Sequence, residues 1–293
     1  MADTFPVGWG LAAAINQWLL YGGALLAVGS ALFGLWVPVP PAAKGLTRVV
    51  GRRSSGLAAV LYVLAVGLVG ADLLGVPGGI LDPRSWAFGM QTTLLSSAGF
   101  GVAAMGLLLW NFTTPGRLQR LTVVAGSALM VSSFLVTGHP VVTAPRWLGA
   151  PAYALHLLGA AFWLGALAPL RRAIGVLPPN EAWAVVAAFS RRAVYAVAAI
   201  VLSGVVLGAM HVGSVAALTA TSYGQRLMIK VALAAAVVGI AVYNKVVLTP
   251  ALARGATEAK PRLRLSIAVE LALLVLILGA AVALTLVPLP TGD

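Results

Sequence analysis

Three histidines are the side chains best suited to metal chemistry in this sequence: His139, His156 and His211. Neutral imidazole is a common ligand for copper and zinc, and the methionine thioether selects Cu(I). Three methionines lie at the same expected level of the protein as the histidines: Met90, Met210 and Met228. These residue types favour a soft-metal site made of histidine with auxiliary methionine.

Each of these residues also has a purely structural interpretation. A methionine in an apolar helix commonly fills a packing gap. His139 precedes a proline in a turn, where it needs no ligand, and His156 lies inside an apolar segment, where a hydrogen bond to a neighbouring helix would satisfy it. The metal hypothesis therefore requires the three imidazole rings to meet.

Four charged side chains fall inside or beside apolar segments, where charge is costly and often functional: Asp72, Arg226, Lys230 and Glu270. Arg226 and Lys230 are four residues apart and share a helix face. We expect gating or pairing roles, with Asp72 paired to Arg226 or Lys230, and Glu270 paired to Lys245 or Arg192. The alternative for the outer three is snorkelling to the interface, and Trp163 and Tyr223 are expected to pack near the site.

The composition excludes a soluble protein. Of the 293 residues, 60% are hydrophobic and 9% are charged, and the mean hydropathy is +0.99. An average soluble domain carries about 25% charged residues. The net charge of +12 comes from short basic clusters between apolar runs, which indicates membrane orientation rather than a nucleic-acid partner. The sequence has no cysteine, which suits an oxidising exterior and excludes thiolate metal sites.

The hydropathy pattern predicts an all-α, polytopic membrane bundle of about eight helices forming a single membrane domain over 1–293. A bilayer span needs about 20 apolar residues, and these runs are too long for barrel strands. The predicted spans are 11–36, 56–76, 87–111, 121–138, 150–170, 193–213, 225–248 and 266–287. We also predict a separate short interfacial helix over 182–190, with Trp183 at headgroup depth, and a small capping loop over 214–222.

The basic residues predict the orientation. Fifteen of the nineteen fall on one side of these spans: Lys44, Arg48, Arg52, Arg53, Arg117, Arg120, Arg171, Arg172, Arg191, Arg192, Lys245, Arg254, Lys260, Arg262 and Arg264. The basic side faces the cytoplasm, so both termini should be extracytoplasmic. This topology places all three histidines toward the outer face. No nucleotide-binding or hydrolase motif occurs, and we assign no catalytic residues and no enzyme activity.

Part of the chain resembles a known family. The stretch from Leu155 to Leu167, with His156 and Trp163, is similar to the pattern of copper resistance protein D (CopD). So are the segments Thr221–Lys230, Tyr243–Lys245 and Leu248–Pro250, and the last span with Glu270. The likeness covers 139–293, the last four helices, whereas the first four, in 1–138, carry no recognised motif.

The resemblance implies a multi-pass protein of the bacterial inner membrane that handles copper, and its matching positions are His156, Trp163, Tyr223, Arg226, Lys230 and Glu270. It also implies a separate, soluble periplasmic copper-binding protein of CopC type as a partner. We further expect membrane lipid around the chain and no nucleic-acid partner. Our first hypothesis is copper uptake, as Cu(I) rather than Cu(II), through the outward-facing His/Met site. The alternatives are a b-type haem oxidoreductase with His156 and His211 as axial ligands, and a non-transporting membrane partner of a copper chaperone.

Overall fold

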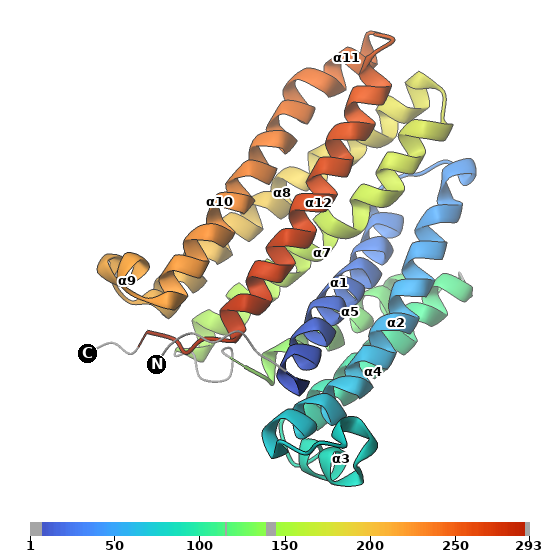
Figure 1. Ribbon diagram of the computed structural model, residues 1–293. Helices are drawn as coiled ribbons and strands as arrows, with labels where there is room; N and C mark the ends of the chain where they lie inside the picture. The colour runs from blue at the N-terminus through green and yellow to red at the C-terminus, as the bar shows by residue number, and fades with distance from the viewer. Residues whose placement is uncertain (1–7, 115, 139–144, 291–293) are drawn as a thin grey trace.

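The computed structural model describes residues 8–114, 116–138 and 145–290, and this part of the chain contains helices, turns and no strand. The elements are α1 (Trp9–Trp36), α2 (Pro41–Leu74), the short 3-10 helix η1 (Gly79–Leu81), α3 (Pro83–Gly89), α4 (Leu94–Thr113), α5 (Gln119–Leu135), α7 (Arg146–Val176), α8 (Pro179–Val212), α9 (Val215–Ala220), α10 (Ser222–Tyr243), the π-helical turn η2 (Asn244–Leu248), α11 (Thr249–Ala253) and α12 (Ala259–Thr285). Figure 1 shows the long helices side by side in one tilted bundle.

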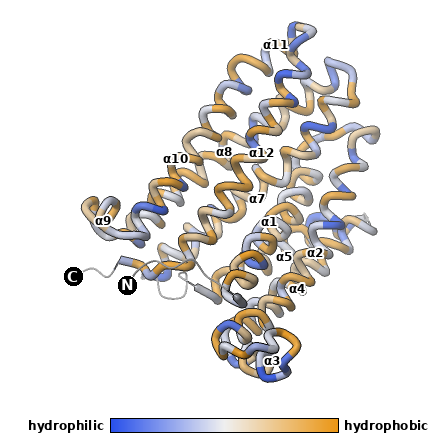
Figure 2. Tube along the Cα trace, viewed as in Figure 1, coloured by the Kyte–Doolittle hydropathy of each residue, from blue (hydrophilic) through white to orange (hydrophobic). Residues whose placement is uncertain are grey.

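Seven of the described helices are long and apolar enough to cross a bilayer, with α10, η2 and α11 forming one continuous span. The eighth expected span, α5, is an apolar helix of 17 residues. At 1.5 Å per residue it is about 25 Å long, the lower limit for a span. Hydrophobic residues dominate the helices in Figure 2. The predicted polytopic helical membrane bundle is confirmed.

Helix α1 occupies the centre of the bundle and packs against α2 on one side and α7 on the other. The first four long helices join through α2, α4 and α5, and the last four through α7, α8, α10 and α12. At the α1–α7 crossing, a Cβ on Gly29 or Gly165 would overlap the backbone of the other helix. Two glycines therefore let the halves approach to backbone contact, as small residues do in membrane helices.

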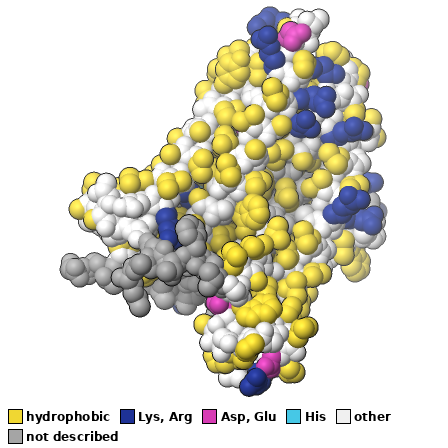
Figure 3. Space-filling view, viewed as in Figure 1, with side chains coloured by type: hydrophobic (Ala, Val, Ile, Leu, Met, Phe, Trp, Pro, Cys, Tyr) yellow, Lys and Arg dark blue, Asp and Glu magenta, His cyan; other side chains and the backbone are white. Residues whose placement is uncertain are grey.

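The two ends of the bundle differ in charge. Figure 3 shows lysine and arginine side chains gathered toward the end where α11 lies, and few at the end where α3 and α9 lie. The beginning of α1 and the end of α12 share the second end, because Gln17 and Thr285 are joined by a hydrogen bond of 3.3 Å. We call the end with α11 the basic end and the end with α3 and α9 the outer end.

The predicted span 87–111 begins too early. The chain breaks into α3 and α4 at Met90–Thr93, and α4 is the membrane-spanning part. Asp82 caps α3 through the backbone N–H of Arg84, and hydrogen bonds from Arg84 hold the pKa of Asp82 below its usual value. At the other end, the Thr92 hydroxyl donates to Gly89 O and accepts from the N–H of Leu94, so it substitutes for the missing helical bonds.

The predicted interfacial helix 182–190 is also wrong as a separate element. It is the first part of α8, which runs unbroken for 34 residues from Pro179. No proline or glycine interrupts the sequence between Pro179 and Gly204, so nothing ends the helix at Arg191 and Arg192. Helix α2 likewise begins at Pro41 instead of residue 56 and carries its basic cluster beyond the apolar segment.

Candidate functional site

His211 lies in a buried cluster of aromatic side chains near the outer end. Its Nε2 is 3.0 Å from the hydroxyl of Tyr153 on α7, and its Nδ1 is 2.9 Å from the hydroxyl of Tyr223 on α10. A neutral imidazole donates from one nitrogen and accepts at the other. The two tyrosines therefore occupy both ring nitrogens and tie α8 to its two neighbours.

His156 lies about one turn further into α7 than Tyr153. Its Nδ1 is 3.2 Å from both Ile200 O and Ser203 Oγ on α8. A carbonyl oxygen only accepts, so Nδ1 carries the hydrogen and the lone pair is on Nε2. The Ser203 hydroxyl donates to Ala199 O in its own helix, which leaves its oxygen to accept from His156. Metal-binding histidines are commonly fixed in this way through their other nitrogen.

Lys230 is half-buried on α10, and its ammonium makes no hydrogen bond or ion pair within the described residues. Its positive charge acts on His156. One turn further out, Arg226 donates from Nη1 to Ala283 O of α12 over 2.8 Å. The two residues therefore differ, since Arg226 connects helices and Lys230 places a charge beside the inner histidine.

The two histidines occupy successive levels rather than one. Ser203, which holds His156, precedes His211 by eight residues on α8, which is about 12 Å along the helix. Tyr153 and His156 are three residues apart on the same face of α7. The α7–α8 interface thus presents one imidazole near the outer end and a second one deeper.

A third polar level lies toward the basic end, around Glu270 of α12. This carboxylate is only 3% exposed; it accepts from Trp163 Nε1 at 3.4 Å and from Asn244 Nδ2. Asn244 is the first residue of η2, where Pro250 lacks the N–H needed to continue regular α-helical bonding. The Thr249 hydroxyl bonds instead to Asn244 O at 2.8 Å.

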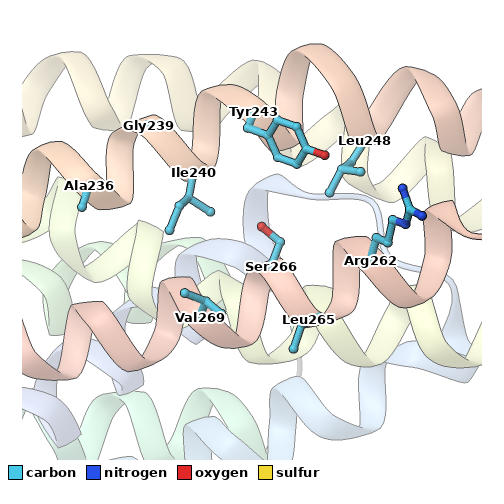
Figure 4. Close-up of a pocket in the computed structure, with 9 residues that line it drawn as sticks. All are labelled: Ala236, Gly239, Ile240, Tyr243, Leu248, Arg262, Leu265, Ser266 and Val269. Carbon is cyan, nitrogen blue, oxygen red and sulfur yellow. The ribbon is translucent and has the colours of Figure 1, made fainter.

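A cavity of about 320 Å³ adjoins this carboxylate between α7, α8, α10 and α12. Its walls are mainly apolar, and its polar lining is Trp163, Ser190, Asn244, Lys245, Thr249 and Glu270. On another side of the α10–α12 pair, a shallower groove of about 560 Å³ holds Tyr243, Ser266 and Arg262 (Figure 4). Leu265 in this groove is 67% exposed, so the groove lies on the exposed side of the two helices.

Two predicted ion pairs are wrong. Among the described residues the single ion pair joins Asp82 and Arg84, so Glu270 pairs with neither Lys245 nor Arg192. Arg192 instead donates to Ala188 O in its own helix. Asp72 is exposed on α2 and pairs with neither Arg226 nor Lys230, because α2 packs in the other half of the bundle.

The remaining candidate ligands are dispersed. His139 lies outside the described residues. Met210 is half-buried beside His211, whereas Met228 is 40% exposed on α10. Met90 is 48% exposed at the end of α3, which packs on α2 and η1. In the described part of the chain, no three His, Cys, Asp or Glu residues gather into a metal cluster.

Several partners of the candidate residues were not expected from the sequence. Tyr153 was not among the expected site residues, although it lies three residues before His156 on the same helix face. Asn244 was part of a recognised motif without a role, and Ser203 gave no signal apart from its polarity in an apolar run. Gly204 on α8 lets the His156 ring pack closely, since a Cβ there would lie 3.5 Å from the ring.

Residues 183–284 match the family model described as "Copper resistance protein D". This match covers α8 to α12 almost completely, with His211, Lys230, Asn244 and Glu270 inside it and His156 outside it. The resemblance to the CopD family is confirmed. A curated relative, "Copper resistance protein D" of Pseudomonas syringae pv. tomato, is 29% identical over 263 residues.

That alignment covers 81% of this chain and 82% of the relative. It therefore reaches well into the first four helices, where we recognised no motif. No solved structure matches the chain. The chain is thus a multi-pass membrane protein whose similarity to this copper resistance protein D extends beyond the segment matched by the family model.

Proposed function

We propose that this protein transports copper across the bacterial cytoplasmic membrane, inward, through histidine positions that open toward the outer end. The observation that carries the proposal is the geometry of His156. Its Nδ1 hydrogen is held by α8, while its Nε2 has no hydrogen-bond partner within the described residues. An imidazole oriented in this way presents one lone pair to an incoming metal ion.

Copper would meet two imidazoles in turn. His211 is enclosed by two tyrosine hydroxyls, so it accepts a metal ion only when one of them moves away. His156 lies one level deeper, on the same pair of helices. Half-buried Met210 beside His211 supplies a soft auxiliary ligand. Neutral ligands suit Cu(I), because a monovalent soft ion in an apolar interior gains little from a carboxylate cage.

Lys230 would act as a gate. An ammonium beside His156 repels a cation at the inner level, and it does so strongly where the dielectric constant is low. Moving the flexible lysine side chain away removes this barrier, and its return prevents back-flow. The similarity to copper resistance protein D, in both the family match and the relative, supports copper as the cargo.

The test is copper uptake into sealed proteoliposomes. We expect His156→Ala to lower the initial rate by at least about tenfold, since even outer-shell partners of a metal ligand contribute about 10- to 100-fold. Leu155→Ala is the matched control, because this neighbour of His156 on α7 is 54% exposed. Equal uptake by His156→Ala and Leu155→Ala would reject the transport path.

The same preparation separates the rival functions. Copper binding without any uptake by the wild-type protein would favour a non-transporting partner of a soluble copper chaperone. A Soret band in the optical spectrum, lost on replacing His156 or His211, would favour the haem-bearing oxidoreductase.

A further inference from the structure

The buried carboxylate of Glu270 has no charged partner in the part of the chain that the structure describes, although it lies deep in the bundle. It is 3% exposed, and its neighbours are the neutral donors Trp163 and Asn244. The cavity beside it is walled mainly by apolar side chains from four helices, Leu167, Phe189 and Ile267 among them. An isolated carboxylate in such surroundings is costly unless a positive charge neutralises it.

Asn244 supplies a second polar atom without a partner. It is 8% exposed, and its Oδ1 is buried without a hydrogen-bond donor among the described residues. The same amide donates from Nδ2 to Glu270, and it lines the cavity. A buried acceptor left unsatisfied costs about 1–3 kcal/mol, so such an atom commonly marks a bound water or ion.

The local backbone supports a binding role. Asn244 begins a π-helical turn, an irregularity that is frequent at functional sites in α-helices. Lys245 is the other charged residue that lines the cavity, and it is exposed at the basic end. Two nearby arginines, Arg171 of α7 and Arg192 of α8, donate to backbone oxygens. The cavity thus joins the buried oxygens to the basic end.

We propose that Glu270 and Asn244 form a binding site for one small hard cation, H⁺ or Na⁺, loaded from the basic end, and that its occupancy controls inward copper movement. A proton on Glu270 removes the charge outright. A sodium ion is neutralised by the carboxylate and coordinated by Asn244 Oδ1. Oxygen donors of this kind disfavour Cu(I), which prefers sulfur and imidazole. The coupling rests on the proposed function, whereas the cation site does not.

The cation site is tested on the full-length purified protein without copper. In one arm, infrared spectra report the carbonyl stretch of a protonated carboxyl group; in the other, melting temperature is measured in sodium and in choline at one pH. A ligand that binds the native state raises the melting temperature. Glu270→Gln should abolish the infrared band if the ligand is a proton, or the sodium-dependent rise if it is sodium.

Glu258→Gln is the matched control, because it removes an exposed carboxylate from the turn before α12. It should behave as the wild-type protein in both arms. Asn244→Ala provides a second variant should Glu270→Gln not fold, and it should weaken the same signal. Absence of both signals from the wild-type protein, or their persistence in Glu270→Gln, would overturn the site.

Copper uptake by proteoliposomes then tests the coupling. In the wild-type protein the rate should change with the gradient of the cation identified above, and in Glu270→Gln it should not. Identical cation dependence in both proteins would refute the coupling. Failure of the wild-type protein to take up any copper would reject the proposed function and its coupling together, while the copper-free measurements would still decide the cation site.

Discussion

His156 and Ser203 show how one hydroxyl tunes a potential ligand. Because Ser203 Oγ and Ile200 O both accept from Nδ1, the imidazole is fixed in the tautomer that leaves Nε2 open. The contact spans two helices, so the ligand geometry depends on how α7 packs on α8. A serine in an apolar run is therefore a positioning residue here, acting through the histidine.

We predict that Ser203→Ala weakens copper binding by up to about tenfold, since it removes one of the two acceptors that orient His156. Thr113→Ala is the control, because the Thr113 hydroxyl bonds only within its own helix at an exposed position. Titration of both purified variants with Cu(I) measures the difference. Equal affinities in the two variants would show that Ser203 does not position the ligand.

At the scale of helices, the bundle depends on close approach at a few glycines. Gly165 on α7 and Gly29 on α1 meet where the two halves of the molecule cross. Neither helix can accept a Cβ at this point without moving the other. The same helix carries Trp163 and His156 just before Gly165 in the chain, so the position of the crossing also sets the depth of these two side chains in the bundle.

Gly165→Ala should therefore lower the free energy of unfolding by about 1–3 kcal/mol, the usual cost of overpacking. Gly99→Ala on α4 is the control, since its Cβ would meet nothing within 4 Å. It should be neutral or slightly stabilising, because alanine favours helix over glycine. Thermal unfolding in detergent compares the two, and equal melting temperatures would contradict the close packing.

The sequence predicted where helices exist better than where they end. Apolar runs located α1, α7, α10 and α12 because lipid requires such runs. Helix continuity through Arg191 and Arg192 was missed, since a charge cluster ends a hydrophobic segment without ending a helix. The break at Met90–Thr93 was missed for the converse reason. This short segment carries no charge and lies between apolar runs, so hydropathy reads through it, whereas the hydroxyl of Thr92 takes the place of helical bonds there.

Site partners were harder to predict, because they depend on which helices are neighbours. Glu270 was expected to find a basic partner near the same end of the bundle, yet the packing of α12 on α7 and α10 gives it Trp163 and Asn244. His211 was expected at the end of its helix and lies in the last turn of α8, but its two tyrosine contacts come from separate helices. Hydropathy predicts how deep a residue lies in the membrane, but it does not predict which neighbouring helix the side chain contacts.

At the scale of the whole molecule, the asymmetry of basic residues predicts which end faces the cytoplasm. The gathering of lysine and arginine toward the end with α11 matches the positive-inside rule (Figure 3). The outer end carries α9 and the His211 cluster. In the proposed path, copper would enter at the first imidazole and leave beside the Glu270 cavity.

Because the sequence has no cysteine, single cysteines report the orientation directly. Ala216 on α9 and Thr257 between α11 and α12 are both exposed. We expect a membrane-impermeant maleimide to label Ala216→Cys in intact spheroplasts, and Thr257→Cys only after permeabilisation. The reverse pattern would invert the topology and the direction of transport proposed from it.

The most direct measurement is X-ray absorption at the copper edge, together with bound copper per protein, on the purified copper-loaded chain. For the wild-type protein we predict imidazole scattering and bound copper, and for the His156→Ala/His211→Ala double variant the loss of both. Unchanged copper content and spectrum in the double variant would contradict a histidine site for copper in this protein.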